Sequence, residues 1–288
     1  MKHKLPPALL LIFVFTFFSC RKEDTPDPAP QPREEVVAYG VAYGTDSLQI
    51  MDVYIPYGLR DTMALLVMVH GGSWYTGDRS HFAAWFEYEK NRKQYAAINI
   101  EYRLDTDRTV PVPMQTDDIA AAIRAVKEKY DLNTGKIGML GVSAGAHLAA
   151  LYAYHYDTEH HVKAVVDWCG PVDFNDPQYH EPGHWAWIFS GIEYIFGRPY
   201  QGNEDYYASV SPYFYVNAQS PPTIILHGEQ DTLVPPSQAI RLHEKLDRAG
   251  VDNELRLYPH SGHIFERQDG LDAFWHCEPF LDRHLLGH

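Results

Sequence analysis

A serine between two glycines is the first residue of this chain that could do chemistry. The pentapeptide Gly141-Val142-Ser143-Ala144-Gly145 has the pattern G-x-S-x-G, follows the apolar run 136–140 and precedes the alanine-rich run 146–151. This order predicts a strand, a sharp turn and a helix, with the serine in a strained conformation and small neighbours that avoid collisions. Ser143 is therefore a candidate nucleophile. The pattern also fits an ordinary helix start capped by Ser143. The two interpretations differ in whether the chain also supplies the other groups that a nucleophilic serine needs.

A nucleophilic serine needs a base that accepts its proton, a carboxylate that orients the base, and backbone N–H groups that bind the oxyanion. Residues with these chemistries follow three other apolar runs, in the segments 70–73, 227–231 and 259–263. We predict that His263 is the base and that Asp231 orients it. Glycine-rich backbone permits close approach to the oxyanion, and the predicted N–H donors are those of Gly72, Ser73 and Ala144.

Other residues could fill two of these roles. Asp167 and Asp173 follow another apolar run and could orient His263, although the context D-T-L-V-P favours Asp231. His260 lies three residues before His263 and could exchange roles with it.

Metal and cofactor binding are not expected. The histidines at 160, 161, 180 and 184 are not accompanied by clustered acidic or cysteine ligands, so we interpret them as solvated or packed side chains. Cys169 and Cys277 are interpreted as buried small hydrophobic residues, and their spacing does not show whether they pair.

The elements that must position these residues alternate along the chain. Continuous apolar runs are typical of strands buried on both faces of a parallel sheet, and amphipathic segments between them predict crossover helices. We expect strands at 36–39, 48–55, 63–69, 95–100, 136–140, 162–166, 222–226 and 255–258, and helices at 81–92, 116–130, 237–249 and 271–286. The carboxyl ends of parallel strands gather reacting groups at one edge of a sheet.

One α/β domain is predicted over residues 35–288. Segment 172–221 breaks the alternation and is rich in proline, tyrosine and tryptophan, so we predict a cap over a pocket there. Trp74 and Trp185 are candidate substrate contacts, with Trp187 and Tyr194 as further candidates. Tryptophans at such spacing also fit the core of a cap.

The amino-terminal segment predicts export. Positive charge precedes an apolar run of eleven residues, 8–18, which is too short to span a bilayer but suits a signal peptide over residues 1–19. The small residue before Cys20 resembles a bacterial lipoprotein signal, in which Cys20 is lipidated and anchors the chain to the membrane. Segment 20–34 carries four prolines within seven residues and predicts an extended tether. We expect an envelope lipoprotein in the outer membrane, exposed at the surface, with a secreted protein as the alternative.

The charge of the chain excludes one class of partner. The formal net charge is −14, with 24 basic and 38 acidic residues. A nucleic-acid partner is therefore not expected.

From about Tyr39 to Leu286 the chain resembles the hormone-sensitive-lipase-like branch of the α/β-hydrolases, particularly bacterial esterases that act on acetylated or feruloylated plant polysaccharides. The order serine, aspartate, histidine is the order of this fold. The resemblance is carried by the segments H-G-G-S-W, E-Y-R-L, G-V-S-A-G-A-H-L-A, S-P and H-G-E-Q-D-T-L-V-P. It implies an α/β-hydrolase fold with a small cap, a loop-supporting role for His70 and no cofactor. Ser73 stands where the family usually has glycine, and its hydroxyl could narrow the pocket or bind substrate.

These observations predict a serine carboxylesterase that removes a small acyl group, with acetyl as the first candidate, from an oligosaccharide. Two alternatives stay open. A formamidase or amidase of the same fold shares the H-G-G-x-W loop, as in kynurenine formamidases. A non-catalytic carbohydrate-binding lipoprotein would retain the fold, and a serine peptidase is disfavoured because the chain lacks a large additional domain. Acyl and alcohol specificity and the oligomeric state stay open.

Overall fold

A computed structural model describes residues 1, 31–58, 60, 62–132 and 135–287 of the chain. The compact unit spans Gln31–His288, and the description below concerns this unit alone. The predicted signal peptide, 1–19, and Cys20 lie outside the described residues. The tether was predicted to extend to residue 34, but Arg33 already pairs with Gly58 through two backbone hydrogen bonds of 2.9 and 3.1 Å.

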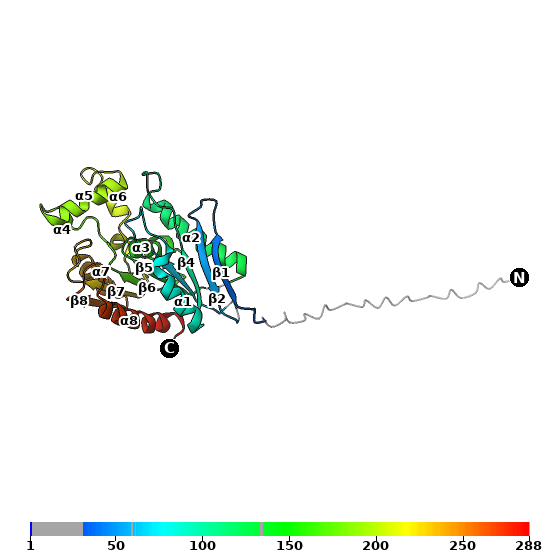
Figure 1. Ribbon diagram of the computed structural model, residues 1–288. Coiled ribbons are helices and arrows are strands. Elements are labelled where there is room, and N and C mark those ends of the chain that lie inside the picture. Colours follow the sequence, from blue (N-terminus) through cyan, green and yellow to red (C-terminus); the bar gives the residue numbers. More distant parts are fainter. Residues whose placement is uncertain (2–30, 59, 61, 133–134, 288) are drawn as a thin grey trace. The chain divides into compact units, whose positions relative to one another are not determined.

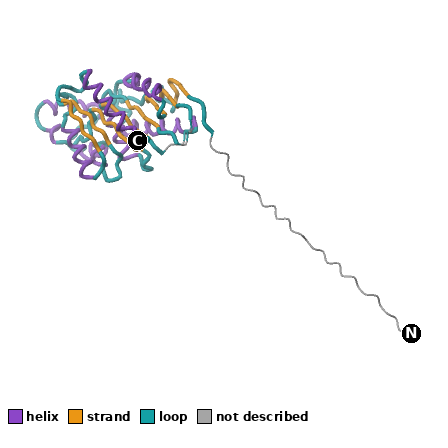
Figure 2. The backbone as a smooth tube through the Cα atoms, turned by 90° about the horizontal axis from the view of Figure 1, so that it is seen from below, coloured by secondary structure: helices purple, strands orange, loops and turns teal. Residues whose placement is uncertain are grey.

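An eight-stranded sheet forms the centre of the unit, in the order β1-β2-β4-β3-β5-β6-β7-β8 (Figures 1 and 2). The first two strands are antiparallel to their neighbours, and all pairs from β4 to β8 are parallel. The predicted α/β class is therefore confirmed. The strands are β1 (Val36–Ala42), β2 (Ile50–Ile55), β3 (Leu65–Val69), β4 (Ala96–Ile100), β5 (Ile137–Val142), β6 (Val162–Trp168), β7 (Thr223–Gly228) and β8 (Asn253–Tyr258).

Helices cover both faces of the sheet. One apolar cluster joins a face of the sheet to η1, α1 and α8, and a second joins the opposite face to α2, α3 and α7. In Figure 1, α8 (red) lies below the strands and α2 and α3 above them. Burial on both faces explains why a strand such as β3 is apolar throughout. The helices are η1 (Arg79–Phe82), α1 (Ala83–Arg92), α2 (Val112–Tyr130), α3 (Ala144–Leu151), the π-helix η2 (Tyr152–Tyr156), α7 (Ser237–Ala249) and α8 (Arg267–Leu285).

Helix α2 begins at Val112, four residues before the predicted start at Thr116. Pro111 precedes the helix and Pro113 lies in its first turn, where a missing N–H costs nothing. Because the helix begins earlier than predicted, Asp118 lies beyond its first turn. Its buried carboxylate instead pairs with Arg103 after β4, with Nη2 2.6 Å from Oδ1 and Nε 2.9 Å from Oδ2.

The segment between β6 and β7 contains four short helices: α4 (Pro177–His180), α5 (His184–Phe196), α6 (Glu204–Ser209) and η3 (Pro212–Tyr215). Helix α5 buries Phe189, Ile192 and Phe196 against an aromatic cluster that includes Phe174 and Tyr207. Its opposite side carries exposed rings. This segment therefore folds on an aromatic core of its own while leaving aromatic side chains free to face a ligand.

Cys169 and Cys277 are both buried free thiols, as predicted. Among the described helices, none combines the length and apolar character that crossing a bilayer requires.

Glu89 on α1 is a buried carboxylate whose ionisation lowers the stability of the folded protein. Its side chain accepts a hydrogen bond from Trp85 Nε1 at 3.0 Å and lies 3.6 Å from Arg92. Burial raises the pKa of Glu89 to about 7, although Trp85 and Arg92 oppose this shift. An unfolded glutamate titrates near 4.3, so the folded state binds more protons than the unfolded state between about pH 4 and 7. Stability therefore falls as the pH rises through this window.

We expect Glu89→Gln to stabilise the folded protein at high pH, because glutamine carries no charge. Its amide oxygen can still accept the hydrogen bond from Trp85. Relative to the parent, the free energy of unfolding should increase by about 1–3 kcal/mol at pH 8, and by less at pH 5. Urea titrations at the two pH values measure the difference. Glu87→Gln, which changes an exposed glutamate of the same helix, is the control. A Glu89→Gln effect of equal size at both pH values would contradict the prediction.

Candidate active site

Ser143 lies at a sharp turn between β5 and α3. Its backbone has φ 56° and ψ −124°, and its side chain makes no capping hydrogen bond to the helix. Gly145 packs against the end of β3, because a Cβ atom there would lie 2.1 Å from the carbonyl oxygen of Val69. The strained backbone and the close approach are those of a nucleophile elbow, so the helix-cap interpretation of Ser143 is wrong.

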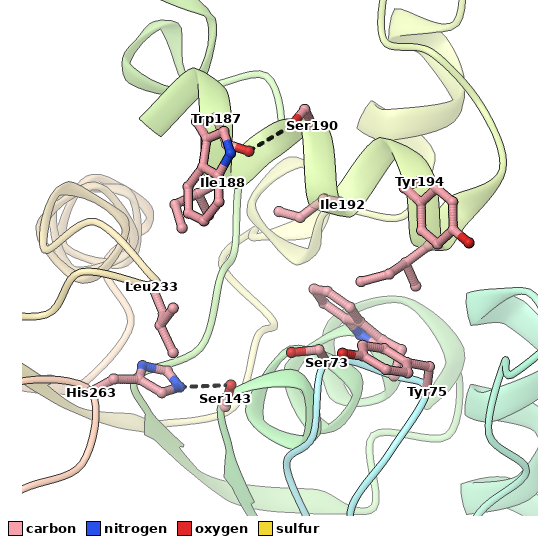
Figure 3. A pocket seen from close by; sticks show the side chains of 13 residues that line it. Ser73, Tyr75, Ser143, Trp187, Ile188, Ser190, Ile192, Tyr194, Leu233 and His263 are labelled. Carbon is pink, nitrogen blue, oxygen red and sulfur yellow. Dashed lines mark hydrogen bonds between the residues drawn. The ribbon is translucent and has the colours of Figure 1, made fainter. Parts of the chain in front are cut away.

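His263 and Asp231 reach Ser143 from two other strand ends. Asp231 lies in the turn after β7, and His263 follows β8. The Nδ1 atom of His263 lies 2.7 Å from Asp231 Oδ2, and its Nε2 atom lies 2.9 Å from Ser143 Oγ (Figure 3). With Nδ1–H donating to the carboxylate, Nε2 presents the lone pair that accepts the serine proton. The structure thus brings together the three residues predicted for catalysis.

The Asp231 carboxylate is held ionised by its surroundings. Oδ1 accepts backbone hydrogen bonds from Leu233 and Val234 at 2.8 and 2.9 Å, and His227 Nε2 lies 3.3 Å from Oδ2. Burial opposes ionisation, but the hydrogen bonds from His227 and His263 outweigh it, and the pKa of Asp231 lies well below its usual range. Asp231 is therefore an anion that can stabilise a positive charge on His263.

The alternative acids and base lie elsewhere. Asp167 Oδ1 accepts a hydrogen bond from the N–H of Gly170 at 2.8 Å, and burial raises its pKa to about 6. Asp173 forms an ion pair with Arg241. His260 has an exposed side chain.

The loop after β3 carries two of the predicted oxyanion donors. Gly72 has φ 122°, and a Cβ atom there would lie 2.0 Å from the carbonyl oxygen of Thr76, so the tight turn requires glycine. Ser73 and Trp74 follow with φ 51° and 63°. Ser73 lines the same cavity as Ser143 (Figure 3). Ala144, the third predicted donor, is the first residue of α3, where backbone N–H groups have no partner within the helix.

His70 supports this loop rather than facing the cavity, as predicted. Its ring is buried and stacks on Tyr102 at 4.3 Å. Nδ1 donates to the carbonyl oxygen of Gly71 at 2.7 Å, and the Tyr102 hydroxyl donates to the carbonyl oxygen of His70 at 2.9 Å.

A cavity of about 550 Å³ lies above Ser143 and His263. Figure 3 shows Ser73 beside Ser143 at the base, and Trp187, Ile188 and Ile192 above them on α5. The cavity is large enough for a small organic ligand. It combines a few polar groups at its base with apolar and aromatic walls.

Of the two tryptophans predicted to contact substrate, one lines the cavity and the other does not. Trp74 lines the cavity, but it is only 4% exposed and serves mainly as a wall packed against Phe174 and Phe196. Trp185 packs against the core and is not among the residues that line the cavity. Its place is taken by Trp187, which is 71% exposed.

Seven residues that line the cavity were not predicted from the sequence: Tyr75, Ile188, Ser190, Gly191, Ile192, Ile195 and Leu233. For the α5 residues a signal existed, because Ile188, Gly191, Ile192 and Ile195 are three or four residues apart and so share one face once a helix is assumed. Tyr75 and Leu233 lie in loops, and no periodicity marks them.

His147 on α3 fixes the position of the Trp74 ring. It accepts a hydrogen bond from Trp74 Nε1 at Nδ1, 3.0 Å away, and donates from Nε2 to the carbonyl oxygen of Val210 at 2.6 Å. Burial lowers the pKa of His147 to about 4, although the hydrogen bond to Val210 opposes the shift. The neutral ring that this arrangement needs is therefore the form present near neutral pH.

The histidines once considered as metal ligands have packing roles. His180 stacks on Tyr200 at 3.7 Å, and His184 Nε2 lies 2.8 Å from the carbonyl oxygen of Thr232. In the described part of the chain, one group of possible ligand atoms lies within 4.8 Å, on Cys169, His227 and Asp231. The Asp231 oxygens already accept the hydrogen bonds described above, so this group is explained by the architecture around Asp231.

A mostly parallel sheet that presents a serine elbow, an aspartate and a histidine at successive strand ends defines an α/β-hydrolase. Within that fold, the chain belongs to the BD-FAE family, whose model matches residues 51–246.

Known relatives are consistent with this placement. Esterase LipC of Mycobacterium tuberculosis is 27% identical over 80% of this chain and 60% of its own length. The acetyl esterase of Salmonella schwarzengrund is 26% identical over 71% of this chain and 66% of its own length. A truncated carbohydrate esterase from gut microbiota superposes with a TM-score of 0.71 at 23% identity, over 87% of this chain and 96% of that structure. The chain spans about half to two thirds of the length of curated relatives such as LipC.

Proposed function

We propose that the protein is a serine carboxylesterase that removes a small acyl group, with acetyl as the first candidate, from a carbohydrate. One observation carries the proposal: the hydrogen-bonded series Ser143, His263 and Asp231 ends in a cavity beside the loop that carries Gly72 and Ser73. This is the arrangement needed for acyl transfer to a serine hydroxyl.

In the acylation step, Ser143 Oγ attacks the ester carbonyl carbon while its proton passes to His263 Nε2. The resulting imidazolium is stabilised by the ionised Asp231. The N–H groups of Gly72, Ser73 and Ala144 face the negative oxygen, and the amino-terminal end of α3 adds its dipole. Collapse of the intermediate breaks the bond to the alcohol, which leaves with the proton from His263.

In the second step, water replaces the alcohol. His263 Nε2 accepts a proton from water as its oxygen attacks the acyl-Ser143 carbonyl carbon, and the same proton returns to Ser143 Oγ when the acid is released. The chain therefore needs no cofactor for either step.

Support for a small acyl group comes from the base of the cavity. Ser73 places a side chain next to Ser143 (Figure 3), at a position where the family that the sequence resembles usually has glycine. The buried ring of Trp74 also lines the cavity. Support for a carbohydrate alcohol comes from the exposed rings of Tyr75, Trp187 and Tyr194 at the cavity walls, since apolar ring faces can pack on aromatic side chains. The likeness to an acetyl esterase agrees with the small acyl group.

A series of p-nitrophenyl esters tests the proposal. The purified protein should hydrolyse the acetate at least about tenfold more efficiently, by kcat/KM, than the octanoate, because a longer chain must be accommodated beside Ser73 and Trp74. N-formylkynurenine is the substrate that would identify a formamidase instead. Preference for the octanoate would contradict the small acyl pocket, and faster cleavage of the formamide would overturn the esterase proposal.

We also propose that Cys20 carries a lipid that anchors the chain in the bacterial envelope, which the segment 1–20 of the sequence supports. A Cys20→Ala variant that stays in the membrane fraction would overturn this anchor.

A further inference from the structure

A second hollow, of about 430 Å³, adjoins the active-site cavity and shares Tyr75, Gly191 and Tyr194 with it. It lies between α5 and the loop 105–108 that follows β4. Figure 3 shows Tyr75 and Tyr194 on the side of the cavity away from His263. A ligand that fills both hollows would therefore extend from Ser143 along α5 toward this loop.

The second hollow combines aromatic and charged groups. The Arg108 guanidinium lies 4.2 Å from the ring centroid of Tyr194, which is 71% exposed. Among the described residues, no carboxylate lies within 4.0 Å of this guanidinium. Arg108 therefore keeps donors available for a ligand.

Two carboxylates complete the polar lining. Asp105 Oδ1 accepts the N–H of Val110 at 3.0 Å, and Asp107 Oδ1 accepts the hydroxyl of Thr109 at 2.6 Å. These bonds hold the loop in place. Within the described residues, no hydrogen bond is recorded at Oδ2 of either carboxylate, so each can accept from a ligand hydroxyl.

The position of Arg108 depends on the end of α5. Its backbone has φ 66°, in the left-handed region, and its side chain passes close to Gly197. A Cβ atom on Gly197 would lie 3.3 Å from Arg108 Cδ. The stem of Arg108 is thus seated against the helix that also presents Tyr194.

We propose that this hollow binds a second, neutral sugar ring of an acylated oligosaccharide, while the ring that carries the ester lies over Ser143. The inference rests on the esterase function proposed above. Sugar hydroxyls can donate to the Asp105 and Asp107 carboxylates and accept from Arg108, and the apolar ring faces can pack on Tyr75 or Tyr194. A hydrocarbon chain would leave these charged groups desolvated and unpaired. An acidic sugar would face two carboxylates against one guanidinium.

Contacts remote from the reacting ester raise kcat/KM when they persist in the transition state. The protein should therefore cleave a β-1,4-linked xylobiose monoacetate about tenfold or more faster, by kcat/KM, than the matching xylose monoacetate. Unacetylated xylobiose should be a competitive inhibitor, and xylose a weaker one.

Gly191→Leu offers a way to close the passage between the two hollows. Gly191 lies inside α5 and lines both, and a Cβ atom there would meet no heavy atom within 4 Å. Leucine is also a better helix former than glycine, so the variant should fold. We expect the preference for the disaccharide to fall at least about fivefold, toward parity, and inhibition by xylobiose to weaken.

Arg108→Ala tests the same site through a different group and should also lower the preference about fivefold. The matched control is Arg198→Ala, because Arg198 lies 4.4 Å over the Tyr206 ring outside both hollows. This control should keep the parent's preference.

The measurement is kcat/KM for p-nitrophenyl acetate, xylose monoacetate, xylobiose monoacetate and the monoacetate of a disaccharide that carries a uronic acid. A preference for neutral xylobiose that both Gly191→Leu and Arg108→Ala remove would support the second-ring site. Hydrolysis of all esters without a disaccharide preference, or a preference that survives in Gly191→Leu, would overturn it while leaving the esterase function intact. A preference for the acidic disaccharide would overturn the neutral assignment. No turnover of any ester would overturn the esterase function itself.

Discussion

Replacement of Ser143 by alanine should abolish ester hydrolysis, with kcat/KM for p-nitrophenyl acetate falling by at least about 10⁴-fold. The physical reason is that Ser143 Oγ is the atom that forms the covalent bond, and it lies 2.9 Å from His263 Nε2, the group that accepts its proton. Reaction with a fluorophosphonate should likewise be lost, because this reagent forms its bond to the same oxygen. Mass spectrometry of the labelled protein should place the adduct on Ser143 in the parent chain.

A loss of activity is informative only if the variant is folded. The Ser143 side chain makes no capping bond to α3, so Ser143→Ala should unfold at nearly the parent's temperature. Ser209→Ala is a control, because the Ser209 hydroxyl donates within its own turn, to the carbonyl oxygen of Tyr206, and alanine retains the backbone carbonyl that accepts from the Tyr215 hydroxyl. Undiminished turnover in Ser143→Ala would overturn the nucleophile assignment. A parent protein that neither turns over esters nor reacts with the fluorophosphonate would favour a binding protein that has retained the fold.

The strands were predictable because each is a local signal. A run such as 63–69 is apolar throughout only if both faces of its strand are covered, and the structure covers both faces of β3. The order of Ser143, Asp231 and His263 at strand ends then follows from the topology of a parallel sheet, since those ends share one edge. Interactions between distant segments were harder to predict from the sequence. The pairing of Asp118 with Arg103 was not predicted, because nothing near Asp118 in the sequence identifies Arg103 as its partner.

The residues of the cavity walls also combine features that local sequence predicts with features that depend on distant segments. Trp74 adjoins the loop that was recognised, so its place near the site could be predicted, but its burial depends on His147 and Phe196 from distant segments. Trp185 and Trp187 differ only in the face of α5 that each occupies. That face is set by how Phe189 and Phe196 pack beneath the helix, which the sequence near Trp185 does not determine. Substrate contacts were therefore harder to predict than the reacting groups.

Replacement of Asp231 by asparagine should lower kcat by about 10⁴-fold while leaving the fold intact. Asparagine has nearly the shape of aspartate and can still accept the backbone N–H groups of Leu233 and Val234 through one oxygen. It can then present an NH₂ group to His263 Nδ1, which favours the tautomer with the proton on Nε2. That tautomer cannot accept the proton of Ser143, and the anion that would stabilise the imidazolium is gone.

Asp167→Asn is the matched control, because Asp167 is also buried, near the end of the central strand β6, and was one of the two alternative acids. Asparagine at 167 retains the oxygen that accepts the N–H of Gly170, and burial, which raises the pKa of Asp167 to about 6, disfavours the charged form that the substitution removes. The control should therefore keep kcat within a few fold of the parent, whereas Asp231→Asn should not. If the two results were reversed, Asp167 would be the residue that orients His263, and the 2.7 Å contact between His263 and Asp231 would not be the catalytic one.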